Sequence, residues 1–437
     1  MNSMDRKAAL REIYQAALDA VAPGPALTRA LAPWAHAPRD FGGVWVIALG
    51  KAARPMAEAA AHVLTAAGHA PSGGLVVAPD NGPRPHPSIA VVVGDHPEPG
   101  AGSLAAAESL ERLVQRIPAG HAVWVLLSGG TTSLIGAPQP GIAPHELTAL
   151  YARLLRSGLD IRAMNRVRKR FTRWSGGRLA LSLAHAGLVH CFIVSDVIGD
   201  DLAAIGSGPC VPDPSTAPEV RAALVAAGLW DQIAPSIRNH LDQVENGRIP
   251  ETPKAGDPAV DRVESHLIAT NRVALEAAGR RAAELGLVPE IVEPPIVGEA
   301  AKVGTTLAHA LLNPATAASD PAERRCLILG GETTVTLGAA TGRGGRSQEL
   351  ALAAARDLQG SEYATLLAAG TDGRDGPTDA AGAVVDGTTW ERISAAGRDP
   401  EQDLRHHDSY AALDAAGALI KTGPTGTNVM DIVLGIR

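Results

Sequence analysis

The sequence has few cysteines, few aromatic residues and no excess of positive charge. Its 437 residues include three cysteines, Cys191, Cys210 and Cys326, and no CxxC pair, so neither a disulfide scaffold nor a zinc ribbon is expected. Aromatic residues make up 3%, too few to predict base-stacking platforms for single-stranded nucleic acid. The formal net charge is -7 and no basic stripe stands out, which argues against a nucleic-acid partner.

Long hydrophobic runs are also missing. No stretch reaches ~18 uninterrupted apolar residues, so no membrane-spanning segment and no membrane partner are predicted. The first 21 residues intersperse charges with helically spaced apolar residues, a pattern that differs from a signal peptide. With 46% hydrophobic and 19% charged residues, the chain is expected to be a cytoplasmic α/β protein with an ample core. A homodimer is compatible with the sequence, which does not determine the oligomeric state.

Short β-branched runs alternate with Ala-rich helical segments. The runs predicted as strands span residues 44–49, 74–78, 89–93, 122–127, 188–195, 266–270, 326–330, 333–338, 364–370 and 429–436. Their continuous apolar character is typical of strands buried on both faces. The alternation predicts a two-domain α/β fold. We expect the larger domain to contain a Rossmann-like, doubly wound, mostly parallel sheet, and the smaller α/β domain a mixed sheet.

One stretch rich in Pro, Gly and charge, and without an apolar period, marks the expected domain boundary. The prediction is an N-terminal Rossmann-like domain over 1–245, a linker over 246–262 and a C-terminal α/β domain over 263–437. The active site is expected in the cleft between the two domains.

Charged and small residues follow the predicted strands, where open α/β sheets bind ligands. Lys51 follows the first strand at a helix start, a position suited to an anion, although a solvated lysine would look the same. The run Ser128–Ser133 can wrap a phosphate or a carboxylate, or form an ordinary turn. Asp196 and Asp372 come just after strands, where carboxylates can hold a hard cation such as Mg²⁺ or belong to a cap or turn.

Two arginine-containing segments complete the pattern. Arg168 and Lys169 belong to a cation-dense helix that can bind an anionic substrate or simply be solvated. The glycine-rich run 342–345 is expected to form a flexible collar that lets Arg346 reach an anion at the start of the next helix. Cations for anionic groups, carboxylates for a metal and glycines for close approach together fit phosphoryl transfer.

In order along nearly the whole chain, these motifs resemble the glycerate 2-kinase family, also labelled hydroxypyruvate reductase in tartrate-utilisation operons. The segments that carry the resemblance include "ALGKAARPM", "LLSGGTTSL", "SDVIGDDLAAIGSGP", "GRGGRSQEL", "GTDGRDGPTDAAGA" and "TGPTGTNVMDI". The resemblance implies ATP-dependent, Mg²⁺-assisted phosphorylation of the 2-hydroxyl of D-glycerate, a small-molecule substrate, to give 2-phosphoglycerate. It also implies that Lys51 and Arg346 are central to the site.

The expected site combines the positions suggested by both arguments. The candidate catalytic residues are Lys51, Arg346 and Asp196, and the candidate substrate-binding residues are Ser128, Gly129, Gly130, Thr131, Ser133, Arg168, Lys169 and Ser347. The candidate nucleotide- and phosphate-binding residues are Gly331, Glu332, Thr333, Gly344, Gly345 and Thr371, and the candidate metal ligands are Asp196, Glu332 and Asp372. Which carboxylate acts as a base and which binds the metal stays open at this point.

Three residues depart from the family pattern. Arg170, Ser175 and Ser347 stand where His, Lys and Asn are common, so a kinase for a related small hydroxy or aldonic acid is an alternative. An NAD(P)H-dependent hydroxypyruvate reductase is a second alternative, but no GxGxxG fingerprint follows any predicted strand. A non-catalytic sugar-acid or nucleotide sensor is a third alternative, but it would not require so many charged groups.

Overall fold

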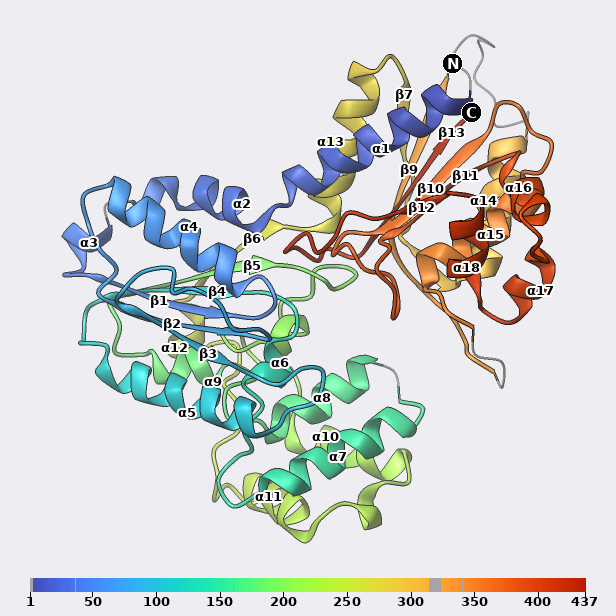
Figure 1. The fold of residues 1–437 in the computed structure, drawn as a ribbon. Helices are drawn as coiled ribbons and strands as arrows, with labels where there is room; N and C mark the ends of the chain where they lie inside the picture. Colours follow the sequence, from blue (N-terminus) through green and yellow to red (C-terminus); the bar gives the residue numbers. More distant parts are fainter. Residues whose placement is uncertain (1–2, 36, 160, 314–323, 339–341) are drawn as a thin grey trace. The chain divides into compact units, whose positions relative to one another are not determined.

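A computed structural model describes residues 3–35, 37–159, 161–313, 324–338 and 342–437 of the chain. The chain forms two compact units (Figure 1). We call Pro23–Ile268 the Rossmann-like unit, and Met1–Ala22 together with Ala269–Arg437 the mixed-sheet unit. This division differs from the predicted one, because the first helix belongs with the C-terminal residues and the expected linker lies inside the Rossmann-like unit.

The Rossmann-like unit contains a six-stranded sheet among the described residues, in the order β3-β2-β1-β4-β5-β6. Its strands are β1 (Val44–Leu49), β2 (Gly73–Ala78), β3 (Ile89–Val93), β4 (Ala122–Leu127), β5 (Leu188–Val194) and β6 (Glu264–Ala269). The pairings from β3 through β5 are parallel, and β1 and β4 are buried along their whole length. Continuous apolar runs form these strands because helices cover both faces of the sheet.

The helices of this unit form two groups. They are α2 (Pro23–Leu31), η1 (Ala32–Trp34), α3 (Ala37–Asp40), α4 (Ala53–Ala66), α5 (Ala101–Arg116), α6 (Thr131–Leu134), α7 (Pro144–Arg156), α8 (Ile161–Phe171), α9 (Arg178–Ser182), η2 (Ile205–Ser207), α10 (Ala217–Ala226), η3 (Trp230–Gln232), α11 (Pro235–Glu245) and α12 (Pro258–Asp261). Helices α2 and α4 lie on one side of the sheet and α5, α9 and α12 on the other (Figure 1). Helices α7, α8, α10 and α11 bury a core of their own around Leu150, Phe171 and Leu241.

The expected linker is packed, because its polar residues bind buried groups of the same unit. Thr252 Oγ1 donates a hydrogen bond of 3.0 Å to Asp213 Oδ2, and Lys254 Nζ donates to the carbonyl of Asp213 at 3.0 Å. Glu251 pairs with Arg170. A stretch whose composition is typical of a flexible connector is therefore fixed by partners that lie far away in the sequence.

The mixed-sheet unit contains a seven-stranded sheet among the described residues, in the order β12-β11-β10-β13-β9-β7, with β8 also paired to β9. Its strands are β7 (Val288–Ile291), β8 (Ile296–Glu299), β9 (Arg325–Thr334), β10 (Thr365–Gly370), β11 (Gly382–Asp386), β12 (Leu419–Ile420) and β13 (Asp431–Ile436). Strands β7 and β8 run parallel to β9, whereas the other pairs are antiparallel. The predicted combination of a parallel and a mixed sheet is confirmed.

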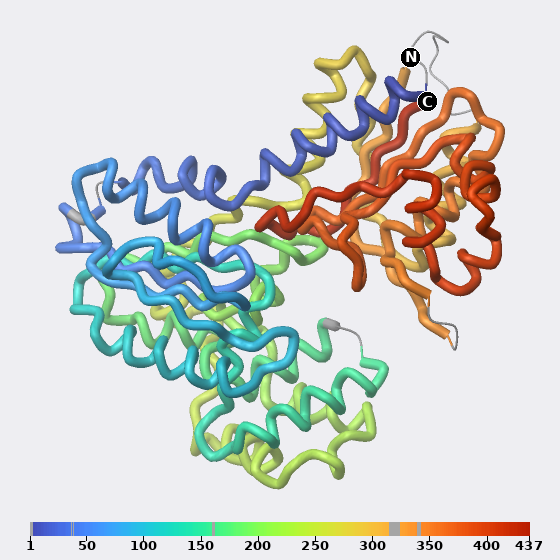
Figure 2. The backbone as a smooth tube through the Cα atoms, in the orientation of Figure 1, coloured from blue at the N-terminus to red at the C-terminus, as the bar shows by residue number. Residues whose placement is uncertain are grey.

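Helices cover this sheet on both faces. They are α1 (Ser3–Ala20), α13 (Asn271–Glu284), α14 (Ala300–Leu312), α15 (Arg346–Asp357), α16 (Thr389–Ala395), α17 (Pro400–Arg405) and α18 (Ser409–Ala415). Helices α1 and α13 lie side by side on one face, and α14 and α15 lie on the other (Figure 2). Helix α1 is fixed by its buried apolar side and by Tyr14, whose hydroxyl donates to the carbonyl of Gly370 at 2.6 Å.

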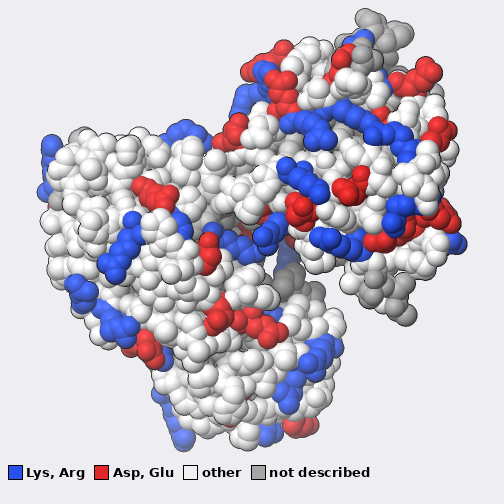
Figure 3. Space-filling model, viewed as in Figure 1, with Lys and Arg blue, Asp and Glu red and all other residues white. Residues whose placement is uncertain are grey.

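The surface carries both signs of charge. On the face that Figure 3 shows, Lys and Arg are interspersed with Asp and Glu rather than gathered in one stripe. Within the described ranges, no helix combines the length and the apolar character needed to cross a membrane.

Candidate functional site

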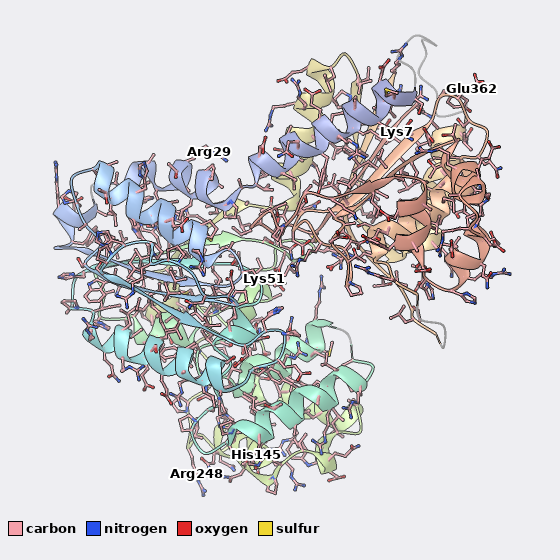
Figure 4. The ribbon with its side chains drawn as sticks, in the orientation of Figure 1. Lys7, Arg29, Lys51, His145, Arg248 and Glu362 are labelled. Atoms are coloured by element: carbon pink, nitrogen blue, oxygen red, sulfur yellow. The ribbon has the colours of Figure 1, made fainter. Side chains whose placement is uncertain are left out.

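The first group of candidate residues lies where the strand order of the Rossmann-like sheet reverses. Strands β1 and β4 are neighbours there, and the connections leave them in opposite directions, the place where such sheets bind ligands. Lys51 follows β1 and its side chain is exposed (Figure 4). Its backbone N–H donates to the carbonyl of Gly129, which follows β4, at 3.0 Å. The two turns are thereby joined, and Lys51 is held at the carboxyl edge of the sheet.

Close packing explains the glycines of these turns. Gly50 has φ +117°, and a Cβ atom on it would lie 2.2 Å from Ser128 Oγ. The Ser128 hydroxyl is buried and accepts a hydrogen bond of 3.0 Å from the N–H of Ala52, at the start of α4. Ser128 therefore fixes the turn. Its hydroxyl is already engaged within the protein.

Asp196 lies directly against the turn that follows β4. A Cβ atom on Gly129 would be 1.9 Å from Asp196 Oδ2, so only glycine allows the carboxylate to occupy this position. Burial raises the pKa of Asp196, and the nearby Lys51 ammonium opposes that shift. The structure brings Lys51, Asp196 and the glycine pair Gly129–Gly130 together. A partly buried carboxylate beside an exposed ammonium can accept a proton or contribute to a cation site.

The remaining small residues of this turn bond mainly within the protein. Thr131 Oγ1 donates to the carbonyl of Ser128 at 2.8 Å, and Ser133 Oγ donates to the carbonyl of Pro97 at 2.6 Å. Gly130 has φ +85°, a backbone conformation that favours glycine. These contacts shape the turn beside Lys51.

Sequence reasoning missed His96, which belongs to the same group. A Cβ atom on Gly130 would lie 3.1 Å from His96 Cδ2 and 3.4 Å from Lys51 Cγ, so the imidazole and the ammonium stem border the same glycine. Burial lowers the pKa of His96, and the charge of Lys51 lowers it further. A neutral imidazole is expected here at pH 7. The signal was the "GDHPEPG" segment directly after β3.

The basic helix α8 is largely structural. Lys169 is buried, and its Nζ lies 2.9 Å from Asp213 Oδ1. Arg170 is fully buried between Asp213, Glu251 and the carbonyl of Ser215. Lys169 also lines a polar cavity of about 260 Å³ together with Arg162, Asn165 and Arg166.

Arg168 is partly buried, in contrast to its two neighbours on α8. Its guanidinium lies 5.0 Å from the centroid of the Tyr151 ring, a cation–π distance. Its Nε is buried and has no hydrogen-bond partner among the described residues. The contacts of Arg168 and Lys169 described above are to Tyr151 and Asp213, neither of which belongs to the group around Lys51.

The second group lines a cavity of about 620 Å³ in the mixed-sheet unit. The lining residues come from the end of β9 and the residues after it, from the segment that leads into α15, from α15 itself, from the loop after β10 and from the turn between α17 and α18. They are Thr333, Thr334, Val335, Leu337, Gly342, Gly344, Gly345, Arg346, Glu349, Asp372, Arg374, Asp375, Gly376, Pro377 and His407. Five of the predicted site residues are among them: Thr333, Gly344, Gly345, Arg346 and Asp372. The walls combine charged groups with aliphatic side chains, as ligand pockets commonly do.

Arg346 is the centre of this group. Its guanidinium donates to both carboxylate oxygens of Asp431, at 2.6 and 3.0 Å, and its Nη1 lies 2.5 Å from Glu332 Oε1. Burial raises the pKa of Asp431, and the Arg346 guanidinium opposes that shift. Two carboxylates thus fix the guanidinium fork, while a third of the arginine side chain stays exposed.

The start of α15 is capped from a distance by Asp375, which sequence reasoning also missed. Its carboxylate accepts hydrogen bonds from the N–H groups of Ser347 at 3.2 Å and Gln348 at 2.8 Å. Burial raises the pKa of Asp375 to about 6, although these hydrogen bonds favour the charged form. A Cβ atom on Gly345 would lie 2.3 Å from Asp375 Cγ. Close packing against Asp375 therefore accounts for this glycine, and the flexibility of the collar stays a prediction.

The other glycines of the collar are also tightly packed. A Cβ atom on Gly342 would lie 2.5 Å from the backbone N of Asp408, and one on Gly344 would lie 2.1 Å from Ser409 Oγ. Residues 339–341, which directly precede the collar, lie outside the described residues.

The remaining candidates of this unit have distinct positions. Gly331 has φ +143°, and a Cβ atom on it would lie 2.3 Å from the carbonyl oxygen of Ile296 on β8. Thr371 is buried and ties two backbone segments: its Oγ1 donates to the carbonyl of Met430 at 2.6 Å and accepts from the N–H of Val429 at 2.8 Å. Asp372 is half-buried in the cavity wall.

Three comparisons place the chain among known proteins. Residues 9–242 match the family described as "Domain of unknown function (DUF4147)", and residues 325–431 match the MOFRL family. The chain is 37% identical over 426 residues to a D-glycerate 2-kinase of Thermotoga maritima, with 97% of each chain covered. The chain belongs to the glycerate 2-kinase family. It is also 38% identical to a glycerate 2-kinase of Pyrococcus horikoshii, with 90% of this chain and 87% of the relative covered.

The similarity to this family extends from the sequence to the fold. The crystal structure of a glycerate kinase from Thermotoga maritima superposes with a TM-score of 0.87 at 36% identity and covers 99% of both chains. In the present chain, the three residues that depart from the family pattern, Arg170, Ser175 and Ser347, are all buried. Arg170 is held by carboxylates, Ser175 Oγ accepts a hydrogen bond of 2.7 Å from Thr172, and Ser347 is 2% exposed. These three side chains therefore contribute to the packing of the protein interior.

Proposed function

We propose that the chain is a glycerate kinase that transfers a phosphoryl group from ATP to the 2-hydroxyl of D-glycerate, giving 2-phosphoglycerate. One observation carries the proposal: Lys51 and the partly buried Asp196 meet at the carboxyl edge of β1 and β4. The relatives that are named glycerate 2-kinases over almost the whole length support the choice of substrate.

The proposed chemistry relies on positioning and on charge. The Lys51 ammonium, exposed at the end of β1, is suited to bind an oxyanion of the phosphoryl group or of the substrate carboxylate. Asp196 is proposed to accept the proton of the attacking hydroxyl, because burial raises its pKa toward that of a useful base. His96, with its lowered pKa, is suited as a neutral hydrogen-bonding group beside them.

The charged cavity of the mixed-sheet unit is proposed to bind the nucleotide phosphates. Arg346 offers a fixed planar fork for an oxyanion, and the aliphatic Val335, Leu337 and Pro377 offer apolar surface for a base or a sugar. Both groups of residues are proposed to take part in the same phosphoryl transfer. Variants in either group should therefore lower the rate of glycerate phosphorylation.

A magnesium ion fits the carboxylates of both groups. Asp196 is a partly buried carboxylate next to the Lys51 ammonium, and Asp372 and Glu332 are partly exposed carboxylates near Arg346, so oxygen ligands of the kind Mg²⁺ prefers are present. When bound, Mg²⁺ supplies neutralisation of phosphate charge. Asp196, Asp372 and Glu332 remain its candidate ligands.

A coupled assay tests the proposal and fixes the phosphorylated position. The protein is incubated with D-glycerate, ATP and Mg²⁺, and enolase is added with or without phosphoglycerate mutase. Enolase alone should produce phosphoenolpyruvate, because it uses 2-phosphoglycerate directly. Product that appears only with the mutase would contradict transfer to the 2-hydroxyl.

The same assay includes the alternatives and a matched control. Other small hydroxy and aldonic acids are offered at the same concentration, and a higher kcat/KM for one of them would replace D-glycerate as the substrate. NADH oxidation by hydroxypyruvate without ATP would favour a reductase. Lys51→Ala should abolish the signal with little change in Tm, because the Lys51 side chain is exposed. Near-normal turnover in this variant would contradict its role.

A further inference from the structure

Three potential metal ligands meet on the Rossmann-like sheet, away from the residues described above. His190 lies on β5, and Glu264 and His266 lie on the neighbouring edge strand β6. His190 Nδ1 is 2.9 Å from His266 Nε2 and 3.5 Å from Glu264 Oε2, and the latter two atoms are 4.0 Å apart. One nitrogen or oxygen of each residue thus lies within 4.8 Å of the others.

Strand geometry explains why these side chains converge. Glu264 and His266 are two residues apart on a strand, so both project from the same face of the sheet. His190 is on the strand beside them. The arrangement is therefore a consequence of sheet register and does not depend on a mobile loop.

The spacing is close to that of a tetrahedral metal site. With metal–nitrogen and metal–oxygen bonds of ~2.0–2.2 Å, ligand atoms of a tetrahedral zinc site lie roughly 3.3–3.6 Å apart. The distances of 2.9, 3.5 and 4.0 Å bracket that range, so rotations of the two partly exposed side chains suffice. Two histidines and a glutamate are a known ligand set for zinc, with a water molecule in the fourth position.

The surroundings fix the orientation of the buried imidazole. The His190 side chain is fully buried, whereas Glu264 and His266 are partly exposed. The Nε2 of His190 is buried with no hydrogen-bond partner among the described residues, which leaves Nδ1 as its polar contact, directed at the cluster. The rings of Trp34 and Phe192 pack against His190 and His266, at centroid distances of 3.9 and 4.9 Å, and restrict their orientation.

We propose that His190, Glu264 and His266 bind a divalent transition-metal ion of the zinc class. The buried His190 anchors the site, and the glutamate, about half exposed, leaves a route from solvent. His190 lies four residues before the end of β5, and a strand rises ~3.3 Å per residue, so it is roughly 13 Å from the carboxyl end of the strand, after which Asp196 follows. The ion would link the edge strand β6 to β5 and has a structural role, separate from phosphoryl transfer.

Metal uptake tests this site with zinc itself as the probe. Protein stripped with EDTA is dialysed against buffered Zn²⁺ in the presence of excess Mg²⁺. The bound metal is then measured by mass spectrometry, and the affinity for Zn²⁺ is measured by competition with a chromophoric chelator. The wild-type chain should bind one Zn²⁺, and Tm should rise on binding because the ion stabilises the folded state. His266→Ala should weaken Zn²⁺ binding by more than ~10-fold, because even the loss of a residue that only hydrogen-bonds to a metal ligand typically costs that much affinity.

Controls separate this site from adventitious binding and from the proposed catalysis. Glu264→Gln, a second exposed variant, should also weaken binding, whereas His62→Ala, which removes an exposed histidine of α4, should not. A tetrahedral absorption spectrum with Co²⁺ should appear in the wild-type chain and vanish in His266→Ala. Glycerate phosphorylation should be unchanged in both site variants. Equal Zn²⁺ affinity in wild type and His266→Ala, or no uptake by either, would overturn the proposal and leave a plain histidine–histidine hydrogen bond.

Discussion

Gly129→Ala is expected to impair catalysis by displacing Asp196. The added methyl group would lie 1.9 Å from Asp196 Oδ2, whereas real Cβ contacts are essentially never below 3.0 Å. The carboxylate or the turn must therefore move by about 1 Å, and a misplacement of this size typically costs ~10²-fold in rate. Because φ of Gly129 is not in the left-handed region, backbone strain adds little. The measurement is kcat for glycerate phosphorylation, with Tm recorded for each variant.

Two controls make the test of Gly129→Ala specific. Gly24→Ala, where the nearest atom would be 3.5 Å from the new Cβ, should leave kcat unchanged. In an Asp196→Ala background, which removes the clash, Gly129→Ala should cause no further loss of kcat. A full ~10²-fold additional loss in that background would refute the reasoning, because the methyl group would then act through some other contact.

Three further predictions concern the charged groups of both units. Arg346→Lys keeps the positive charge but loses the planar guanidinium that binds both oxygens of Asp431. The kcat for glycerate phosphorylation should therefore fall ~10²–10³-fold with little change in Tm. A wild-type rate would contradict the proposed role of Arg346 in binding phosphate. Asp213→Ala leaves the buried Lys169 without its carboxylate and removes one of the two carboxylates around the buried Arg170, so it should lower the free energy of unfolding in urea by ~3–5 kcal/mol. Glu276→Ala, which breaks an exposed ion pair, should lower it by less than ~1 kcal/mol, and equal losses would refute the distinction. Burial raises the pKa of Asp375 to about 6, above its ordinary value of 3.8, so the folded state retains a proton that the unfolded state loses. The stability of the wild type relative to Asp375→Asn should therefore be greatest below pH ~4 and decline by roughly 2–3 kcal/mol as the pH rises through 6, and a difference independent of pH would contradict the assignment.

The parallel sheet could be predicted closely from the sequence because its strands are continuous apolar runs. Strands β1, β3 and β4 begin and end at the predicted residues. Lys51 and Asp196 could be paired in advance, since both follow strands whose carboxyl ends share one edge of the sheet. Local sequence patterns and one general rule of sheet topology were sufficient there.

Partners fixed by long-range pairing could not be predicted in this way. Asp431 meets Arg346 across 85 residues because β13 pairs with β9, and no local pattern specifies that pairing. The predicted strand 326–330 is part of a longer strand, β9, which runs on through two glycines packed closely against Asn271 and Ile296. The second predicted strand, 333–338, was wrong beyond Thr334, where β9 ends. Strands β7, β8, β11 and β12 are short, and β7 is mostly exposed, so they carry little apolar signal.

The order of the two units along the chain has a consequence for synthesis on the ribosome. The Rossmann-like unit is continuous, so it can fold as soon as residues 23–268 have emerged. Helix α1 precedes that unit in the chain, whereas its buried partners α13, β10 and β13 all follow the unit. The apolar side of α1 therefore stays unpaired, or shielded by a chaperone, until the whole Rossmann-like unit and at least α13 have been translated.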